Sequence, residues 1–201
     1  MIKIVLATNN SHKVSEFSSA FAQMGVEAEL LTVKETGFQG EIIEDADSFD
    51  GNALIKAKTL CEYTGLVAIA DDSGLAVDAL DGAPGVYSAR FAGEGATDEQ
   101  NNEKLLAILK SMPEASRDAK FVCSICVCRP DGGILYAHGE SKGIIIDEYK
   151  GDGRFGYDPI FYYPPMNKTF AEMTKEEKNQ ISHRGRAIKE LLKSKEFFTE
   201  Q

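Results

Sequence analysis

Hydrophobic and polar positions at the start of the chain switch from one periodicity to another. Ile2–Ala7 is a short apolar run that fits a buried strand, and a polar loop (Thr8–Ser11) follows it. Apolar side chains then recur at helical spacing from Val14 until Gly25, a residue typical of a helix end. A second strand is expected near Ala28–Val33. The pattern therefore predicts a strand, a loop, a helix and another strand.

The same kind of pattern continues in the middle of the chain. It predicts a helix from about Ser48 to Thr64, ended by Gly65, and then a strand over Leu66–Ala70. This strand leads directly into the polar run Asp71-Asp72-Ser73-Gly74. An abrupt change from apolar residues to paired acids is more typical of a functional site than of an ordinary turn.

The rest of the chain predicts turns, a hairpin and two more helical segments. The expected elements are turns at Asp81–Gly85, a helix capped by Thr97 and Gln100 that reaches about Lys110, strands over Lys120–Arg129 and Ile134–Glu140, a further strand at Gly143–Asp147, a loop at Gly151–Gly156 and a helix from about Thr174 to Lys193. Strands that alternate with helices, followed by a hairpin, predict an α/β fold with a mixed sheet. No repeat or linker divides residues 1–201, so a single domain is expected.

Composition and charge exclude several classes of function. The 201 residues are 43% hydrophobic and 27% charged, which is ordinary for a globular protein. The net charge of −10 disfavours a polynucleotide partner, because such partners need a basic face. The apolar runs are too short to span a membrane, and the first residues do not form a secretory signal. The four unevenly placed cysteines fit a reducing cytoplasm rather than a disulfide framework.

The loop before the first helix is a candidate anion site. Backbone N–H groups at a helix N-terminus bind anions, and a lysine in the first turn, Lys13, is disfavoured there unless an anion accompanies it. The loop lacks the glycines of a Walker A motif, so the pattern alone favours an ordinary serine-capped helix with an exposed lysine.

Lys56 is a second candidate because it lies in the apolar stripe of its helix, whereas Lys58 lies on the opposite face. A lysine on the inward face must either extend to solvent or meet an anion, and the sequence favours neither alternative. Asn52 borders the same face one turn earlier.

The acids are the third candidate. Neighbouring carboxylates such as Asp71 and Asp72 repel each other, which favours a bound cation or raises one pKa. Either outcome suits metal binding and general-base catalysis. The segment Glu41–Asp50 adds five acids, which are expected to be mostly solvated, with one of them a candidate metal ligand. Cys123, Cys126 and Cys128 resemble a zinc motif, but a strand turns Cys123 away from the other two, so buried thiols are expected.

Taken together, the motifs resemble the inosine triphosphate pyrophosphatase family, which hydrolyses non-standard purine nucleoside triphosphates. The resemblance extends from Ile4 to about Leu192. It rests on Thr8-x-Asn10-x-x-Lys13, Glu44, Asn52-Ala53 with Lys56, Ala70-Asp71-Asp72-Ser73-Gly74-Leu75, Pro84–Phe91, Phe155-Gly156-Tyr157-Asp158-Pro159, Glu177-Lys178-Asn179 and Ser182-His183-Arg184, in that order. No single motif is decisive, but the ordered set is very specific.

The resemblance implies a fold, a reaction and a set of site residues. The fold would be an elongated mixed central sheet with flanking helices, in two lobes around an active-site cleft, and the protein would form a homodimer. Water would attack the α-phosphorus of ITP, dITP or XTP and release the monophosphate and pyrophosphate, with Mg²⁺ as cofactor. Glu44 and Asp72 would ligate Mg²⁺, with Asp71 close by, and Asp72 would also be the general base.

The remaining implied residues would bind the substrate. The triphosphate would be held by Thr8, Asn9, Asn10, Ser11, His12, Lys13 and Lys56. Ser73 would contact the substrate and Arg90 is expected near the phosphates. The base would be surrounded by Phe155, Gly156, Tyr157, Asp158, Lys178, His183 and Arg184. Hydrogen-bond donors from His183, Arg184 or the loop backbone would pair with the oxygen at C6 of hypoxanthine or xanthine, and adenine has an amino group there.

Two alternatives remain open at this point. One is a related pyrophosphatase that acts on methylated or pyrimidine triphosphates. The other is a non-catalytic sensor that binds a nucleotide and signals, although binding alone does not require Asp72 beside a metal. An interaction domain with merely polar loops does not explain Lys56.

Overall fold

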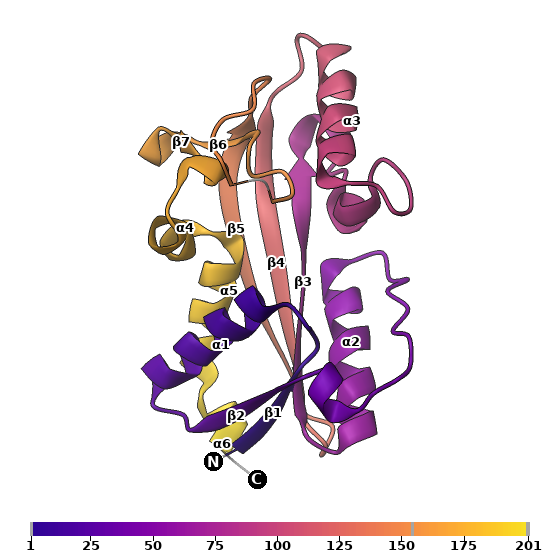
Figure 1. Ribbon diagram of the computed structural model, residues 1–201, viewed down its shortest axis with the longest axis vertical. Coiled ribbons are helices and arrows are strands. Elements are labelled where there is room, and N and C mark those ends of the chain that lie inside the picture. Colours follow the sequence, from indigo (N-terminus) through magenta and orange to yellow (C-terminus); the bar gives the residue numbers. More distant parts are fainter. Residues whose placement is uncertain (1, 154, 200–201) are drawn as a thin grey trace. The chain divides into compact units, whose positions relative to one another are not determined.

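The computed structural model describes residues 2–153 and 155–199, and for His12, Met24 and Thr199 it describes the backbone alone. The strands are β1 (Ile2–Leu6), β2 (Ala28–Thr32), β3 (Val67–Val77), β4 (Asp118–Cys128), β5 (Ile134–Ile145), β6 (Phe161–Tyr163) and β7 (Lys168–Thr169). The α-helices are α1 (Ser11–Met24), α2 (Phe49–Thr64), α3 (Asp98–Lys110), α4 (Lys175–Ile181), α5 (His183–Leu191) and α6 (Glu196–Thr199) (Figure 1). Short 3₁₀ helices include η1 (Lys34–Thr36) and η3 (Gly85–Arg90).

The strands form a mixed sheet in the order β2-β1-β3-β4-β5-β6-β7. β1 pairs in parallel with both β2 and β3, whereas β6 pairs antiparallel with β5 and β7. This mixed sheet with helices confirms the predicted fold class. The chain divides into two compact units, and the long strands β3, β4 and β5 contribute residues to both of them.

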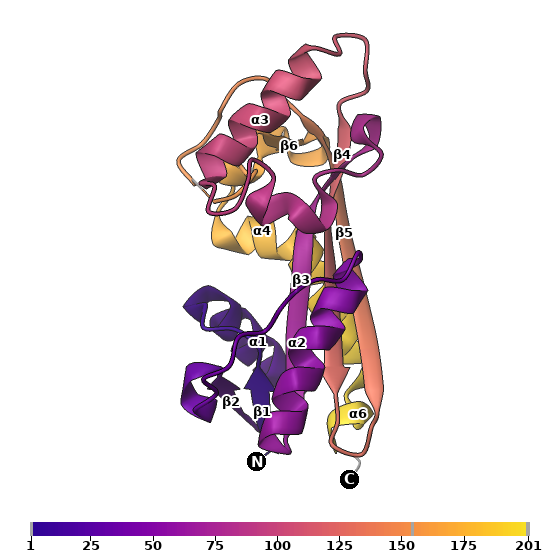
Figure 2. The ribbon, with the colours of Figure 1, turned by 90° about the vertical axis from the view of Figure 1, so that its right-hand side faces the viewer.

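The first unit contains residues 1–72, 123–139 and 186–201, and its sheet is covered on both faces. Successive side chains of a strand point to opposite faces, and β1 shows this directly. Ile4 packs in a buried cluster with Phe17 of α1 and Leu191 of α5. Its neighbour Val5 packs in a different cluster, with Leu60 of α2. Figures 1 and 2 both show α2 lying alongside the first half of β3, and the apolar clusters hold it there.

The second unit contains residues 73–122 and 140–185 and has its own core. Leu75 and Val77 of β3, Leu105 of α3, Phe161 of β6 and Phe170 are almost completely buried in one cluster. Thr97 accepts a hydrogen bond from the Gln100 N–H, and the Gln100 side chain accepts one from the Thr97 N–H, so the predicted capping box is confirmed.

The structure corrects two predicted strand boundaries. β3 does not end at Ala70 but continues through the acidic run to Val77, because each acid meets a lysine and the apolar alternation resumes at Leu75. The separate strand expected at Gly143–Asp147 is instead the end of β5. Small side chains such as Ala137 and Ser141 occupy buried positions of β5 and conceal its period of two.

The C-terminal helical segment is also different from the prediction. The predicted helix over Thr174–Lys193 is interrupted at Ser182, which has an extended backbone conformation at the end of α4. The Ser182 Oγ accepts the Gly185 N–H at 3.1 Å and thereby caps α5. The short strands β6 and β7 were not predicted, since three and two residues carry no readable pattern.

All four cysteines are buried as free thiols. Cys123 packs in the apolar cluster that contains Ile4, whereas Cys126 and Cys128 pack in the apolar cluster that contains Val5. The prediction that Cys123 faces the other way is therefore confirmed. Within the described residues, none of the helices has the length and apolar character needed to cross a membrane.

Candidate active site

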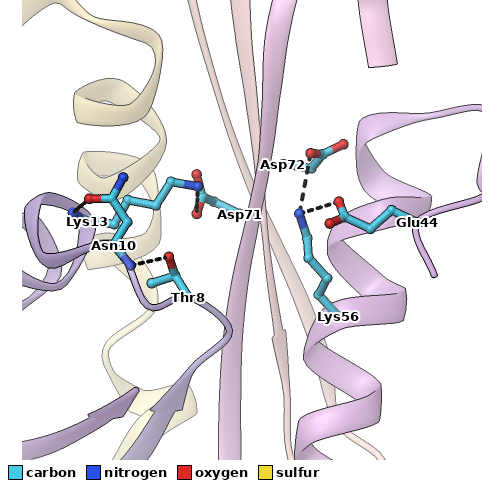
Figure 3. A network of polar contacts seen from close by, with 7 residues as sticks. All are labelled: Thr8, Asn10, Lys13, Glu44, Lys56, Asp71 and Asp72. Atoms are coloured by element: carbon cyan, nitrogen blue, oxygen red, sulfur yellow. Dashed lines mark hydrogen bonds and ion pairs between the residues drawn. The ribbon is translucent and has the colours of Figure 1, made fainter. Parts of the chain in front are cut away.

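Asp71 and Asp72 are neighbours in β3, and their side chains leave the strand on opposite faces (Figure 3). The Asp71 carboxylate accepts a hydrogen bond from Lys13 of α1 at 2.8 Å, whereas the Asp72 carboxylate lies 3.4 Å from the ammonium of Lys56 on α2. The alternation of the strand therefore keeps the two carboxylates apart and gives each its own cation. They do not act as the repelling pair that the sequence suggested.

Lys56 lies at the centre of a polar group on the α2 side of β3, formed with Glu44, Asn52 and Asp72 and called the α2-side cluster below. Its Nζ is 2.7 Å from Glu44 Oε2 and 3.4 Å from Asp72 Oδ1, and only 12% of the Lys56 side chain is exposed. Of the two alternatives open for this lysine, the structure selects the anionic partner. The Asn52 side chain completes the cluster, because its Nδ2 donates to Asp72 Oδ2 at 3.2 Å while its Oδ1 accepts the Ala46 N–H at 3.0 Å.

Burial and charge act on this cluster in opposite directions. Burial tends to lower the pKa of Lys56, but attraction to Asp72 and the bond to Glu44 outweigh it and raise that pKa. The ammonium therefore stays charged. Burial also raises the pKa of Asp72, and the contributions of Lys56 and Asn52 offset only part of that rise. A carboxylate with a raised pKa is a better proton acceptor near neutral pH than an ordinary aspartate.

Glu44 and Asp72 suit a hard divalent cation because both present carboxylate oxygens to one small region. The single ammonium group of Lys56 already contacts both carboxylates, so the two converge on a common positive charge. Across the residues that the structure describes, no group of three or more His, Cys, Asp or Glu is arranged to hold a metal. Mg²⁺ does not need three protein ligands, since it binds through one or two carboxylates together with substrate phosphates and water.

The α1 side of β3 holds the predicted anion loop. Asn10 is its central residue: the Asn10 N–H donates to Thr8 Oγ1 at 3.1 Å, and Asn10 Oδ1 accepts the Lys13 N–H at 3.4 Å. Asn10 is thus the capping residue, and Ser11 is already the first residue of α1, which corrects the expected serine cap. Asn9 ties the loop to η1, because its Oδ1 accepts the Lys34 N–H at 3.0 Å.

A second cluster of predicted residues lies within the other unit. The Lys178 ammonium of α4 donates to the Asp158 carboxylate and lies 5.4 Å from the ring centre of Phe170 and 5.8 Å from that of Phe155. Burial raises the pKa of Asp158, and attraction to Lys178 and Arg184 offsets only part of the rise. Phe155 is 61% exposed, an unusual position for a large apolar ring.

His183 begins α5 and belongs to the same cluster. Its ring is buried and stacks on Phe121, with ring centres 4.8 Å apart and planes inclined by 14°. The loop that carries Phe155 and Asp158 is anchored by Tyr157, whose hydroxyl donates to the Ser88 carbonyl at 2.9 Å. The cluster thus combines flat rings, cations and a carboxylate, which is the chemistry that recognises a heterocyclic base.

The structure groups most of the predicted residues into these two clusters, each within one unit, whereas among the described residues Arg90 and Ser73 form no hydrogen bond or ion pair with either cluster. The first unit brings together Thr8, Asn9, Asn10, Lys13, Glu44, Lys56, Asp71 and Asp72 around β3. The side chain of His12 lies outside the described part of the structure. In the second unit, Arg90 pairs with Glu94 and stacks on Tyr87, and Ser73 is half-buried in β3.

Sequence reasoning missed several residues that shape these clusters. Phe121 and Phe170 supply flat surfaces to His183 and Lys178, but core phenylalanines carry no signal of their own in a sequence. Asp98 and Asn102 of α3 were also missed. Their i, i+4 spacing on a helix whose start was predicted correctly places both on one face, and this signal could have revealed them.

The chain is similar to known proteins over almost its whole length. The model of the Ham1 family matches residues 4–194. A dITP/XTP pyrophosphatase of Desulforamulus reducens is 49% identical over 95% of this chain and 94% of its own, and one of Shigella flexneri is 49% identical over 96% and 97%.

Solved structures agree with this relationship. A HAM1 protein from Coxiella burnetii matches 98% of this chain and 100% of its own with a TM-score of 0.92 and 40% identity. The Ham1 protein of Staphylococcus aureus matches with a TM-score of 0.88 and 40% identity, over 97% of this chain and 98% of its own. The resemblance drawn from the motifs is confirmed, and this chain belongs to the Ham1 family.

Proposed function

We propose that this protein hydrolyses non-standard purine nucleoside triphosphates, dITP and XTP in the first place and ITP with them, to the monophosphate and pyrophosphate. The names of the close relatives support the reaction and the first two substrates. The observation that carries the proposal is the meeting of Glu44 and Asp72 at the Lys56 ammonium, 2.7 and 3.4 Å from its Nζ. A sensor that only binds a nucleotide does not need Asp72 beside a metal.

The α2-side cluster supplies the chemistry. Glu44 and Asp72 are the ligands of Mg²⁺, which when bound neutralises charge on the phosphate oxygens and on the leaving pyrophosphate. Asp72 takes the proton from the water that attacks the α-phosphorus, because it is a carboxylate that lies beside both the proposed metal site and Lys56. Lys56 leaves its carboxylate partners to stabilise charge on the phosphates, and these anions replace the carboxylates in keeping its ammonium group charged.

The α1-side residues bind rather than react. Lys13 and the N–H groups of the first turn of α1 hold phosphate oxygens, in keeping with the preference of helix N-termini for anions. Asp71 holds Lys13 in place through their 2.8 Å contact and does not ligate the metal, which refines the expectation drawn from the motifs.

The cluster of the second unit recognises the base. Phe155 offers an exposed ring for stacking, and His183 with Arg184 donates hydrogen bonds to the oxygen at C6. Adenine would leave these donors without acceptors, at about 1–3 kcal/mol for each lost bond. Assembly as a homodimer stays a prediction, which sedimentation of the purified protein would check.

A substrate panel tests the function directly. Pyrophosphate release is measured from dITP, XTP, ITP, dATP, dGTP, dUTP and a methylated purine triphosphate, with Mg²⁺ and again with a chelator. We expect rapid, Mg²⁺-dependent release from dITP, XTP and ITP and slow release from the others. Preference for the pyrimidine or methylated substrate, or tight dITP binding without any pyrophosphate, would overturn the proposal in favour of one of the two alternatives.

A further inference from the structure

Helix α3 holds the base-recognition loop (residues 155–158) by hydrogen bonds to the backbone of Gly156. Asp98 Oδ2 accepts the Gly156 N–H at 2.7 Å, and Asn102 Nδ2 donates to the Gly156 carbonyl at 2.9 Å. Both polar groups of the Gly156 backbone are thus fixed by two side chains one turn apart on the same helix. Gly156 has a positive φ of 54°, a backbone conformation that glycine adopts without strain.

The position of Gly156 matters because its neighbours carry the predicted base contacts. Phe155 precedes it and is mostly exposed, so little core packing orients the ring. Asp158 lies two residues later and holds the Lys178 ammonium. After Gly156, the loop is anchored by the hydrogen bond from the Tyr157 hydroxyl to the Ser88 carbonyl. Before Gly156, the fixed Gly156 peptide sets the direction of the chain at Phe155.

The burial of Asn102 lowers the stability of the fold, so packing alone does not explain an asparagine at this position. Asn102 is 2% exposed, and its Oδ1 has no hydrogen-bond partner in the part of the chain that the structure describes. A buried polar atom without a partner lowers the free energy of unfolding. The bond to Gly156 is the one compensation that the described residues show, which favours a role in holding the loop.

The adjacent residue Asn101 provides a natural comparison. It is also 2% exposed, but its side chain holds a different segment: Oδ1 accepts the Ala92 N–H at 2.7 Å and Nδ2 donates to the Ala89 carbonyl at 3.2 Å. Two neighbouring, equally buried asparagines therefore brace two separate segments, and only one of these is the base-recognition loop.

We propose that Asp98 and Asn102 are positioning residues for base selectivity: by clamping both backbone groups of Gly156 they hold Phe155 and Asp158 where a 6-oxopurine is distinguished from adenine. This inference rests on the proposed function. It assigns to Asp98 and Asn102 an effect on selectivity that is transmitted through the loop.

The first test compares Asn102→Ala with Asn101→Ala. Both variants remove an equally buried amide from α3. Asn101→Ala should lower the unfolding temperature at least as much as Asn102→Ala, because among the described residues the Asn101 side chain makes two hydrogen bonds and that of Asn102 makes one. We expect the ratio of kcat/KM for dITP to that for dATP to fall by about tenfold in Asn102→Ala, mainly through KM for dITP, because loss of one or two oriented hydrogen bonds has this size. In Asn101→Ala the ratio should stay that of the wild type.

The second test uses Asp98, which is exposed, so its replacement is well tolerated by the fold. Asp98→Ala should lower the same ratio, and Asp98→Asn should restore most of it, because the amide oxygen still accepts the Gly156 N–H. Loop placement can be followed without activity, since the chain contains no tryptophan and Phe155→Trp supplies a single reporter. Acrylamide quenching of this reporter should increase with Asn102→Ala and stay constant with Asn101→Ala.

The outcomes separate the two proposals. A wild-type protein that releases no pyrophosphate from dITP would refute the proposed function. A wild type that does so, together with an unchanged selectivity ratio in both Asn102→Ala and Asp98→Ala, would overturn the positioning role alone. Equal loss of selectivity in Asn101→Ala and Asn102→Ala would likewise overturn it, because general destabilisation of α3 would then explain the effect.

Discussion

The two faces of β3 carry the same chemical pair, an aspartate with a lysine, and differ in what surrounds it. On the α1 side Lys13 forms an ion pair with Asp71 at 2.8 Å. On the α2 side Lys56 is shared between Asp72 and Glu44, so the second carboxylate leaves an excess of negative charge. The α1-side pair is electrically balanced, whereas the α2-side cluster carries the charge that attracts a divalent cation.

The difference teaches that neighbouring residues in a strand can have separate tasks. Alternation sends Asp71 to Lys13 at the start of α1, and sends Asp72 to Lys56, which also contacts Glu44 (Figure 3). The comparison assigns proton transfer and metal binding to one face and orientation of a phosphate-binding lysine to the other. Each assignment can be tested by a single substitution.

The largest effect is expected for Asp72→Asn compared with Asp71→Asn. Asp72→Asn removes the proposed general base, so kcat for dITP should fall by about 10²–10⁴-fold. Asp71→Asn removes only the charged partner of Lys13, so we expect a change of about tenfold or less, chiefly in KM. Steady-state pyrophosphate release at saturating Mg²⁺ measures both, and equal losses in the two variants would contradict the division between the faces.

Stability provides the control for Asp72→Asn. Because the pKa of Asp72 is raised in the folded protein, the folded state holds that proton more tightly than the unfolded state. The resulting contribution to the free energy of unfolding is fully present below the pKa that Asp72 has in the unfolded state. It is lost as the pH rises through the pKa that Asp72 has in the folded state. At pH 7 the ionised Asp72 therefore costs stability, and Asp72→Asn should unfold at the same or a higher temperature than the wild type.

The next effect in size is that of Lys56→Met, with Lys58→Met as its matched control. Both lysines belong to α2, but Lys58 is exposed and pairs with Glu62 at 3.8 Å. Loss of the buried cation should lower kcat/KM for dITP by about 10²–10³-fold, the effect of removing one charge-stabilising donor. Kinetics indistinguishable between the two variants would mean that Lys56 serves the fold and not the reaction.

The smallest expected effect is a shift of the acid limb of the pH profile. Activity requires ionised Asp72, so kcat/KM for dITP should fall as the pH drops through its raised pKa, above the ordinary 3.8. Lys56 lowers that pKa by attraction, so residual activity of Lys56→Met should show an acid limb at higher pH than the wild type. A limb that stays in place or moves to lower pH would exclude Asp72 as the titrating base.

Much of this arrangement could be predicted from the sequence because the signals were local. The apolar stripe of α2 revealed Lys56, and the strand–loop–helix order revealed the loop before α1. What failed depended on tertiary contacts. A strand appears to end at Asp71 and Asp72 unless the lysines that satisfy them are known. Likewise, β5 is hidden because small residues such as Ser141 fill its buried positions.

The individual residues of the candidate site were named by the resemblance to a known family, whereas the contacts that divide them between the two faces of β3 were not predicted. Spacing alone does not show that Asp71 faces Lys13 or that one ammonium group joins Glu44 to Asp72, since these contacts link segments up to 58 residues apart. The same holds for Asn102 and Gly156, which are 54 residues apart.

The most direct test of the central claim is the Mg²⁺ concentration that gives half-maximal pyrophosphate release from dITP in Glu44→Gln and in Asp71→Asn. If Glu44 and Asp72 hold the metal, Glu44→Gln should need at least about tenfold more Mg²⁺ than the wild type, because loss of a single supporting contact already costs that much. Asp71→Asn should need the same concentration as the wild type. An unchanged Mg²⁺ requirement in Glu44→Gln, or an equal increase in Asp71→Asn, would contradict the account.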